Sequence, residues 1–182
     1  MSHYAATVIV ESSELESGEK SLGDAVEILL EPYNENGEWF AEGSRWDWWV
    51  IGGRWEGTLI DKNTGEACDR LQKKDVDWES MAREQVDLLG ARYDDFAVNG
   101  RNGNPFGEAP AAGETRSEFI QREFEPFYTW AFLNKTGWNE VGQMGWFGQA
   151  LDEKRDTWLE EYQRLLRDVK DNDWIVVVDC HV

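Results

Sequence analysis

Residues 174–182 read WIVVVDCHV, a run so apolar that it predicts a strand buried on both faces at the centre of a sheet. The stretch from Leu151 to Val169 precedes it and repeats its apolar residues about every 3.6 positions. That period predicts an amphipathic helix packed on the sheet, with charged residues on its other side. The apolar stripe of this helix consists of Leu151, Trp158, Leu159, Tyr162, Leu165, Leu166 and Val169.

The start of the chain predicts another strand and another helix. Tyr4 to Val10 reads YAATVIV, which is rich in β-branched residues and typical of a strand. Ser21, with Asp24 three residues on, indicates a helix N-cap, and Pro32 indicates where that helix ends. The apolar face expected for this helix is Leu22, Ala25, Val26, Leu29 and Leu30.

The middle of the chain predicts strands first and a helix later. Residues 39–60 read as strand sequence broken at Gly52-Gly53, and a turn at 61–65 leads into residues 66–68. Together they predict a meander of at least three strands. Asp77 is then expected to cap a long helix. The apolar face of that helix would be Trp78, Ala82, Val86, Leu89 and Tyr93.

The order of the elements predicts the fold class. Residues 99–114 are dense in Gly, Pro and Asn and predict a long loop, and Thr115 with Glu118 indicates a capping box for a short helix that ends near Pro126. A hairpin is expected over 128–141, around a Lys-Thr-Gly turn. We therefore predict an α+β fold, a mainly antiparallel sheet with helices packed on it. Its core would be a ferredoxin-like split βαβ unit with an inserted hairpin and a Gly/Pro-rich loop, all in a single domain over residues 1–182.

Charge and composition restrict the classes of function. The 182 residues include 37 acidic and 18 basic side chains, which gives a net charge of −19 and a pI near 4.4. Nonspecific binding to nucleic acid or to an anionic membrane surface is not expected, because both require Lys and Arg to neutralise phosphates. The sequence contains no apolar run as long as a membrane helix and no export signal pattern. Cys68 and Cys180 match neither a disulfide framework nor a CxxC metal pattern, which favours a reducing cytoplasm.

Residues 45–60, RWDWWVIGGRWEGTLI, contain the first candidate site. A two-residue hairpin turn at Gly52-Gly53 would pair Ile51 with Arg54 and sort the side chains into two faces. The core face would be Trp46, Trp48, Val50, Trp55 and Leu59. The other face would hold Arg45, Asp47, Trp49, Arg54 and Glu56, a set able to stack a planar ring and to bind a carboxylate or a phosphate. The alternative is a salt-bridge ladder around one tryptophan that another element covers.

The two histidines of the chain define the second candidate site. The first and last strands are expected to lie side by side and antiparallel, which brings His3 near His181. Alternation places Asp179 on the face of His181, whereas Cys180 points to the opposite face and cannot form a nucleophile–base pair with that histidine. His3, Asp179 and His181 could hold a metal ion, and the simpler interpretation is a buried or hydrogen-bonded histidine pair. We expect no catalytic residue, metal or cofactor, since GxGxxG, GxxxxGK[ST], GxSxG and HExxH patterns are absent from the sequence.

A glycine-bracketed aromatic segment, MGWFG at 144–148, comes just before the last helix. Its glycines could let a ligand approach the backbone at a helix N-terminus, where anions are favoured. The alternative is a tight turn whose tryptophan fills the core, because large aromatic side chains usually pack inside proteins.

These segments resemble a family of small proteins encoded by tailed bacteriophages, especially those of actinobacteria. The resemblance runs from end to end of the chain and is most specific in the tryptophan block. It implies a phage accessory gene whose product acts in the cytoplasm of the infected bacterium, and it implies no particular activity. Asn34 stands where the family pattern has Asp. The segments that carry the resemblance are MSHY at 1–4, LEPYNEN at 30–36, WDWW at 46–49, IGGRW at 51–55, MGWFG at 144–148 and VDCH at 178–181.

Two functions remain as hypotheses. The first is a binding protein that inhibits or sequesters a host protein with a basic surface, for example an anti-defence protein whose acidic surface mimics nucleic acid towards a nuclease or a CRISPR-type effector. The alternative is a protein that binds or hydrolyses a nucleotide or another anion on the face of Asp47, Trp49, Arg54 and Glu56. The sequence favours the binding protein over an enzyme and sets no oligomeric state. The acidic residues expected to contact a basic partner are Glu79, Glu84, Asp87, Asp152, Glu153, Glu160 and Glu161.

Overall fold

The computed structural model describes residues 2–36, 44–100, 109–144, 150–151 and 155–182. The chain packs as two compact units, a sheet unit of Met1–Asp77 and Tyr128–Val182 and a helical unit of Trp78–Phe127. The expectation of a single domain over residues 1–182 stays a prediction. Among the described residues, no helix has both the length and the apolar content needed to cross a membrane.

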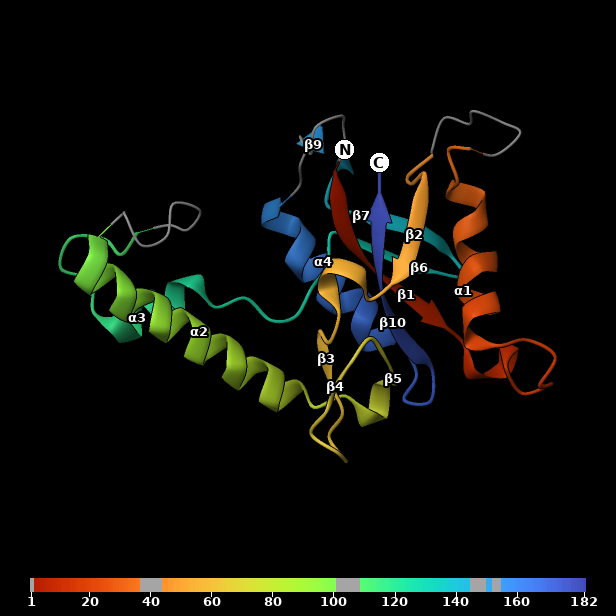
Figure 1. The fold of residues 1–182 in the computed structure, drawn as a ribbon, viewed down its shortest axis with the longest axis horizontal. Helices are drawn as coiled ribbons and strands as arrows, with labels where there is room; N and C mark the ends of the chain where they lie inside the picture. The colour runs from red at the N-terminus through yellow and green to blue at the C-terminus, as the bar shows by residue number, and fades with distance from the viewer. Residues whose placement is uncertain (1, 37–43, 101–108, 145–149, 152–154) are drawn as a thin grey trace. The chain divides into compact units, whose positions relative to one another are not determined.

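The last strand lies at the centre of the sheet unit. β10 (Trp174–His181) pairs antiparallel with β1 (His3–Val10) along its whole length, and His3 is the register partner of His181. On its other side β10 pairs antiparallel with β2 (Trp48–Ile51) and β5 (Arg70–Gln72). Every residue of β10 after Trp174 is buried, and Figure 1 shows the strand running between β1 and β2. The predicted central strand and its antiparallel partner are therefore confirmed.

The remaining strands of this sheet extend it beyond β1. β6 (Ala131–Asn134) lies parallel to β1, and β7 (Gly137–Glu140) pairs antiparallel with β6 as the predicted hairpin. The mixed, mostly antiparallel sheet with its helices confirms the α+β class. The βαβ unit differs from a split one, because β1 and β6 are direct neighbours and β7 lies outside β6 rather than between them.

Helix α1 (Leu22–Leu30) covers one face of the sheet. Ser21 caps it and forms a capping box with Asp24, and the hydrogen bonds from Ser21 lower the pKa of that carboxyl group. The helix gives way to a 3-10 helix, η2 (Glu31–Tyr33), which contains Pro32, so both predicted ends are confirmed. The side chains that α1 buries against the sheet are Ala25, Val26 and Leu30, and Leu22 and Leu29 are partly buried there.

Helix α4 (Arg155–Asp168) covers the opposite face. Tyr162 is buried on it, and its hydroxyl group lies 2.7 Å from Oγ1 of Thr7, which alternates with the β1 residues that face α1. Trp158 donates from Nε1 to the carbonyl oxygen of Thr129 at 2.9 Å. The predicted stripe is confirmed from Trp158 to Val169, with Leu159 half-buried. The inclusion of Leu151 in this helix is wrong, because Leu151 belongs to strand β9 and α4 begins at Arg155. The buried members of the stripe are Trp158, Tyr162, Leu165, Leu166 and Val169.

The predicted meander after residue 39 is wrong. β2 pairs with β10 and not with the next strand in the sequence, because the centre of the sheet offers it a fully buried partner. A small hairpin of β3 (Leu59–Ile60) and β4 (Ala67–Cys68) does form around the predicted turn at 61–65. β8 (Gln143–Met144) pairs with β9 (Ala150–Leu151), and the expected strand residues at 37–43 lie outside the described residues.

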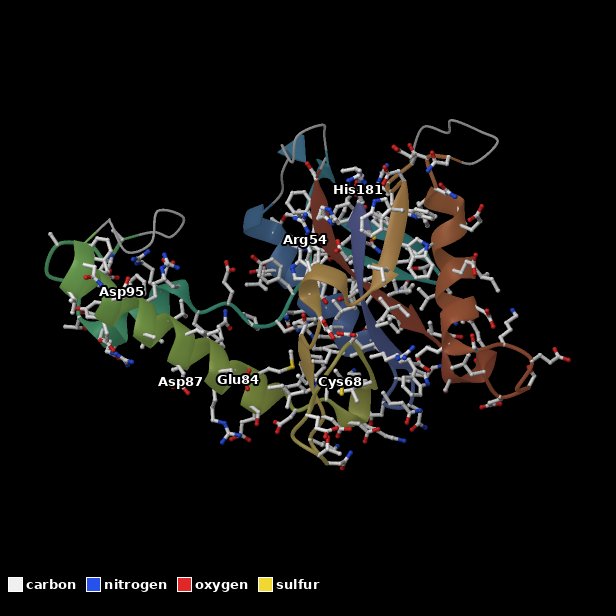
Figure 2. All side chains as sticks on the ribbon, viewed as in Figure 1. Arg54, Cys68, Glu84, Asp87, Asp95 and His181 are labelled. Carbon is white, nitrogen blue, oxygen red and sulfur yellow. The ribbon has the colours of Figure 1, made fainter. Side chains whose placement is uncertain are left out.

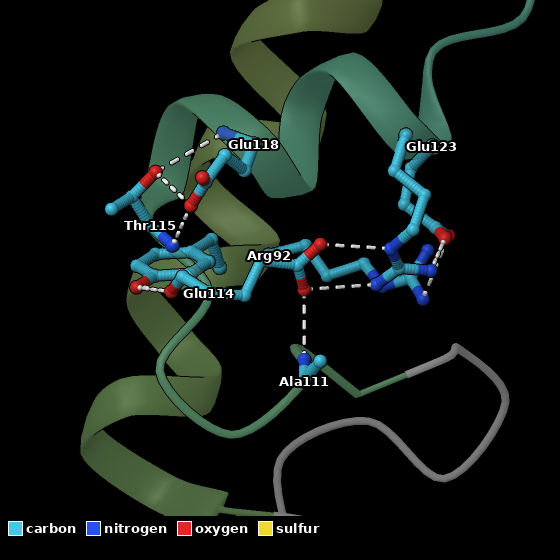
Figure 3. A network of polar contacts seen from close by, with 8 residues as sticks. Arg92, Ala111, Glu114, Thr115, Glu118 and Glu123 are labelled. Carbon is cyan, nitrogen blue, oxygen red and sulfur yellow. Dashed lines mark hydrogen bonds and ion pairs between the residues drawn. The ribbon is translucent and has the colours of Figure 1, made fainter.

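The helical unit consists of α2 (Trp78–Asn99) and α3 (Arg116–Glu123). Thr115 and Glu118 form the predicted capping box, and Glu114 accepts the N–H of Ala111, as Figure 3 shows. Phe119 is buried between the helices, and the guanidinium groups of Arg92 and Arg122 lie over its ring at 5.4 and 5.3 Å. On the predicted apolar face of α2, Val86 is exposed. The predicted loop begins where α2 ends, and residues 101–108 of it lie outside the described residues.

Candidate functional site

The Gly52-Gly53 dipeptide does not form a hairpin turn. The N–H of Gly52 donates to the carbonyl oxygen of Val177 at 2.9 Å, so β2 continues along β10, and residues 53–55 form a 3-10 helix, η3. Both glycines have positive φ, 75° and 60°, and both lie against carboxylates. A Cβ atom on Gly53 would stand 2.6 Å from Oδ2 of Asp179, and one on Gly52 would stand 2.5 Å from Oδ2 of Asp69. The glycines therefore allow a close approach between the backbone and two carboxylates, buried Asp179 and half-buried Asp69, and do not form a hairpin turn.

Because β2 pairs with β10, its faces are the reverse of those predicted. Trp48 and Val50 are 43% and 42% exposed, whereas Trp49 and Ile51 pack against the core beneath α1. The prediction that Trp48 and Val50 are core residues is wrong, and so is the placement of Trp49 on a polar face. Trp46 and Leu59 are buried as predicted, and Trp55 is half-buried.

The five residues of the first candidate site do not share a face. Arg45 forms an ion pair with Glu140 of β7, Nε to Oε1, at 2.9 Å. Burial raises the pKa of Glu140, and the Arg45 charge opposes that rise. Of the others, Asp47 contacts His181, Trp49 packs against the core, Arg54 contacts Asp179 through its backbone, and Glu56 is exposed.

The second candidate site is formed, and Asp179 is at its centre. This carboxylate is 2% exposed. Its Oδ1 lies 2.9 Å from Nδ1 of His3, and its Oδ2 accepts the N–H of Arg54 at 3.1 Å. One buried side chain thus joins the first strand, the last strand and η3.

The other histidine has its own carboxylate and an aromatic neighbour. Nδ1 of His181 lies 2.5 Å from Oδ1 of Asp47, and the imidazole stacks on the indole of Trp48 with centroids 5.2 Å apart and planes 17° apart. His3 meets both rings edge to face, at 5.3 Å from Trp48 and 4.8 Å from His181. Figure 2 shows His181 near the end of β10. We call His3, Asp47, Trp48, Asp179 and His181 the histidine cluster.

The cluster can position protons and a flat ring. Each histidine turns Nδ1 towards a carboxylate oxygen, where an N–H at that atom can donate, and neither Nε2 has a hydrogen-bond partner among the described residues. Among the described residues, no group of three or more His, Cys, Asp or Glu side chains is placed to hold a metal ion. Cys180 is buried on the α1 face, as alternation predicts, and burial raises the pKa of its thiol.

Comparison of the chain with protein-family models, with curated proteins and with solved structures finds no match.

Segments from the two ends and the middle of the chain meet in the histidine cluster. It joins His3, the tryptophan block at 46–49, the glycine block at 51–55 and Asp179 with His181. Of the MGWFG segment at 144–148, only the backbone of Met144 belongs to the described residues. Sequence reasoning placed His3 beside His181 but missed Trp48, because every residue of β2 is apolar and alternation within it could not select the exposed face.

Substitutions at Arg54 and Trp49 are expected to separate backbone from side-chain contributions. Arg54→Ala keeps the N–H that Asp179 accepts and removes only an exposed side chain, so the free energy of unfolding should change by less than about 0.5 kcal/mol. Arg54→Pro removes that N–H and should destabilise by about 1–3 kcal/mol. Trp49→Ala empties part of the core beneath α1 and should cost about 1–3 kcal/mol. Urea denaturation measures all three, and equal effects of the alanine and proline variants at Arg54 would contradict the assignment.

Proposed function

We propose that this chain is a phage accessory protein that binds a basic surface of a host protein and so inhibits or sequesters it. The proposal is supported by the net charge of −19 and by where the acidic side chains lie. A protein with this charge associates quickly with a basic groove and avoids nucleic acid and anionic lipid. Grooves of this kind are typical of nucleases and other effectors that hold a nucleic acid backbone, which makes an anti-defence role our preferred form of the proposal.

The outer face of α1 is the observation that carries this proposal. Residues 11–36 contain eight acidic side chains and one lysine. Glu27 and Glu31 are exposed one turn apart, and Ile28 between them is 50% exposed. An apolar side chain ringed by charged ones is how a protein interface is commonly built, with a dry centre and a polar rim. The acidic side chains Glu84, Asp87 and Asp95 of α2, labelled in Figure 2, are also exposed and add to the charge of the protein.

The partner can be sought by affinity capture from a bacterial lysate, followed by measurement of association at several salt concentrations. The on-rate should fall steeply as the Debye length shrinks from about 30 Å at 0.01 M to about 8 Å at 0.15 M salt, and the off-rate should change far less. An on-rate that does not change with salt concentration would contradict the proposal and would mean that the negative charge serves only to keep the protein soluble.

Neutralising α1 tests the location of the interface. Glu27→Gln with Glu31→Gln should lower the on-rate several-fold, because both charges lie on the proposed surface. The comparison variant is Glu84→Gln with Asp87→Asn on α2, which removes the same number of charges from exposed positions that the sequence analysis also expects to contact the partner. It should lower the on-rate less if α1, and not α2, forms the interface. Both variants should keep the melting temperature of the parent, since exposed charges contribute little to stability. If the comparison variant slows association as much as the α1 variant, net charge and not the α1 face steers the partner.

A small-molecule function remains a second candidate because the histidine cluster is formed. The face that the sequence predicts for such a ligand, Asp47 with Trp49, Arg54 and Glu56, is not assembled. This function would have to use the Nε2 atoms of the two histidines, which make no hydrogen bond to the described residues. A thermal-shift panel of nucleotides and divalent metal ions separates the two functions. The melting temperature of a ligand-binding protein should rise by several degrees with one of these compounds, and that of a protein that binds only a macromolecule should not change.

A further inference from the structure

Trp48 is the largest apolar side chain that the described part of the sheet unit leaves exposed, at 43%. It is nevertheless held in place, because the imidazole of His181 stacks on it and His3 meets it edge to face. Each imidazole is in turn fixed by a carboxylate. An exposed aromatic ring that neighbouring side chains already hold in place is suited to binding, since it loses little conformational entropy when a partner covers it.

The two imidazoles do not lie on opposite faces of the indole. The three ring centroids are separated by 5.2 Å, 4.8 Å and 5.3 Å, which makes the triangle of His181, His3 and Trp48 nearly equilateral. If His3 lay across the indole from His181, the two histidine rings would be about twice the stacking distance apart. Neither histidine therefore covers the second face of the Trp48 indole, and no other ring of the described residues pairs with it.

An acid and an aliphatic side chain lie within two residues of Trp48 in the chain. Asp47 uses Oδ1 for His181, its side chain is 29% exposed, and Oδ2 has no hydrogen-bond partner among the described residues. Val50 is two residues from Trp48 on the same strand, so it lies on the same face of β2, and it is 42% exposed. The surface thus combines a π face, a free carboxylate oxygen and a hydrocarbon patch.

We propose that Trp48, Asp47 and Val50 receive an arginine side chain of the basic partner, an inference that rests on the proposed function. This would be a second contact besides α1, on the face of the edge strand β2 that points away from that helix. The guanidinium would lie over the second face of the indole and donate N–H bonds to Asp47, and its methylene stem would lie along Val50. Arginine suits this surface better than lysine, because its charge is planar, weakly hydrated and able to stack and donate at the same time. The helical unit already contains this packing, with Arg92 and Arg122 over Phe119.

A nucleobase or a partner's aromatic ring could also stack on Trp48, and chemistry decides against both. The net charge of −19 and the carboxylate of Asp47 repel a nucleotide phosphate. A neutral ring would leave the Asp47 oxygen without a donor once water is excluded, which is costly. A stacked arginine satisfies both groups, and aromatic residues and arginine are the side chains that most often dominate binding energy at interfaces.

The experiment uses the whole protein and short probe peptides. The indole N–H resonance of Trp48, identified by its absence in Trp48→Phe, is followed while a capped Gly-Arg-Gly peptide is added, with citrulline and lysine versions as comparisons. We expect a saturable shift with arginine, a weaker one with lysine and none with citrulline. A Trp48 resonance that does not move with arginine, or that moves equally with citrulline or with a nucleoside, would overturn the proposal.

Variants locate the arginine site on the surface. Asp47→Asn keeps an oxygen for His181 but removes the negative charge, and it should weaken arginine binding at least five-fold. The matched control is Glu56→Gln, which removes one exposed carboxylate outside the three proposed residues and should change the affinity less than two-fold. Equal loss in the two variants would mean that general charge alone attracts the peptide. Near-ultraviolet circular dichroism of each variant confirms that the cluster is still folded.

Binding measurements with a partner captured from the lysate test the arginine site separately from the proposed function. Trp48→Ala should shorten the lifetime of the complex at least ten-fold and leave the salt-dependent on-rate in place. A complex that keeps its salt dependence but ignores Trp48→Ala would overturn the arginine site alone. Arginine binding at Trp48 without any salt-dependent partner would support the site and count against the proposed function.

Discussion

Replacing Asp179 by alanine is expected to lower the free energy of unfolding by about 3–5 kcal/mol. The carboxylate is 2% exposed, and both of its oxygens are used, one by His3 and one by the N–H of Arg54. Its removal leaves two partly buried donors without partners, and each such donor costs about 1–3 kcal/mol. It also opens a hole beside Gly53, which lies against this carboxylate. Chemical denaturation monitored by tryptophan fluorescence measures the loss.

The matched control for this prediction is Asp47→Ala. Asp47 also contacts a histidine, but its side chain is 29% exposed, so water can replace it and the expected loss is about 1 kcal/mol. Equal losses in the two variants would show that the burial of Asp179 is not what makes it important. Asp179→Asn should fall between the two, because the amide oxygen can still accept one hydrogen bond and its NH₂ group cannot accept the other.

Trp158→Ala is expected to destabilise the sheet unit by about 3–5 kcal/mol. The side chain is 4% exposed, its ring packs against that of Tyr162 with centroids 5.7 Å apart, and its Nε1 donates to Thr129. The substitution therefore creates a large cavity between α4 and the sheet and also leaves a carbonyl oxygen without its donor. Thermal or urea unfolding gives the size of the effect.

Two further variants on α4 separate the contributions of the cavity and of the lost hydrogen bond to the destabilisation by Trp158→Ala. Trp158→Phe retains most of the volume and loses only the N–H, so it should cost about 1–2 kcal/mol. Leu159→Ala changes the next position, which is half-buried, and should cost less than Trp158→Ala. If Trp158→Ala costs under about 1 kcal/mol, α4 does not pack on the sheet as described.

The elements that sequence could predict are those whose signals are local. The capping boxes at Ser21 and Thr115 are read within four residues, and the apolar periods of α1 and α4 are visible within one helix. The central strand is predictable from composition, since residues 174–182 are too apolar for either face of the strand to be exposed to water. From that strand and Tyr4–Val10, the neighbourhood of His3 and His181 followed by topology.

The parts that sequence could not predict depend on partners far along the chain. Gly52-Gly53 looks like a turn in isolation, and only the acids at Asp69 and Asp179 explain why side chains are missing there. The exposed face of β2 was undetermined because all four of its residues are apolar, so its pairing with β10 decided which ones face outward. The pairing of Asp47 with His181 joins residues 134 positions apart, and no spacing rule reaches that distance.

The position of β10 affects how the protein is made. Within the described residues, β2 and β5 find their strand partner only in β10, which a ribosome translates after both. At about 5–20 residues per second, those strands wait for seconds with the N–H and C=O groups of their edges unpaired. Folding of the sheet unit must therefore finish after residues 174–181 have left the ribosome, and during that interval neighbouring nascent chains could join edge to edge. Mutual repulsion between chains of net charge −19 opposes such contacts. The acidic side chains that are proposed to bind a partner therefore also protect the unfolded protein against association with other copies.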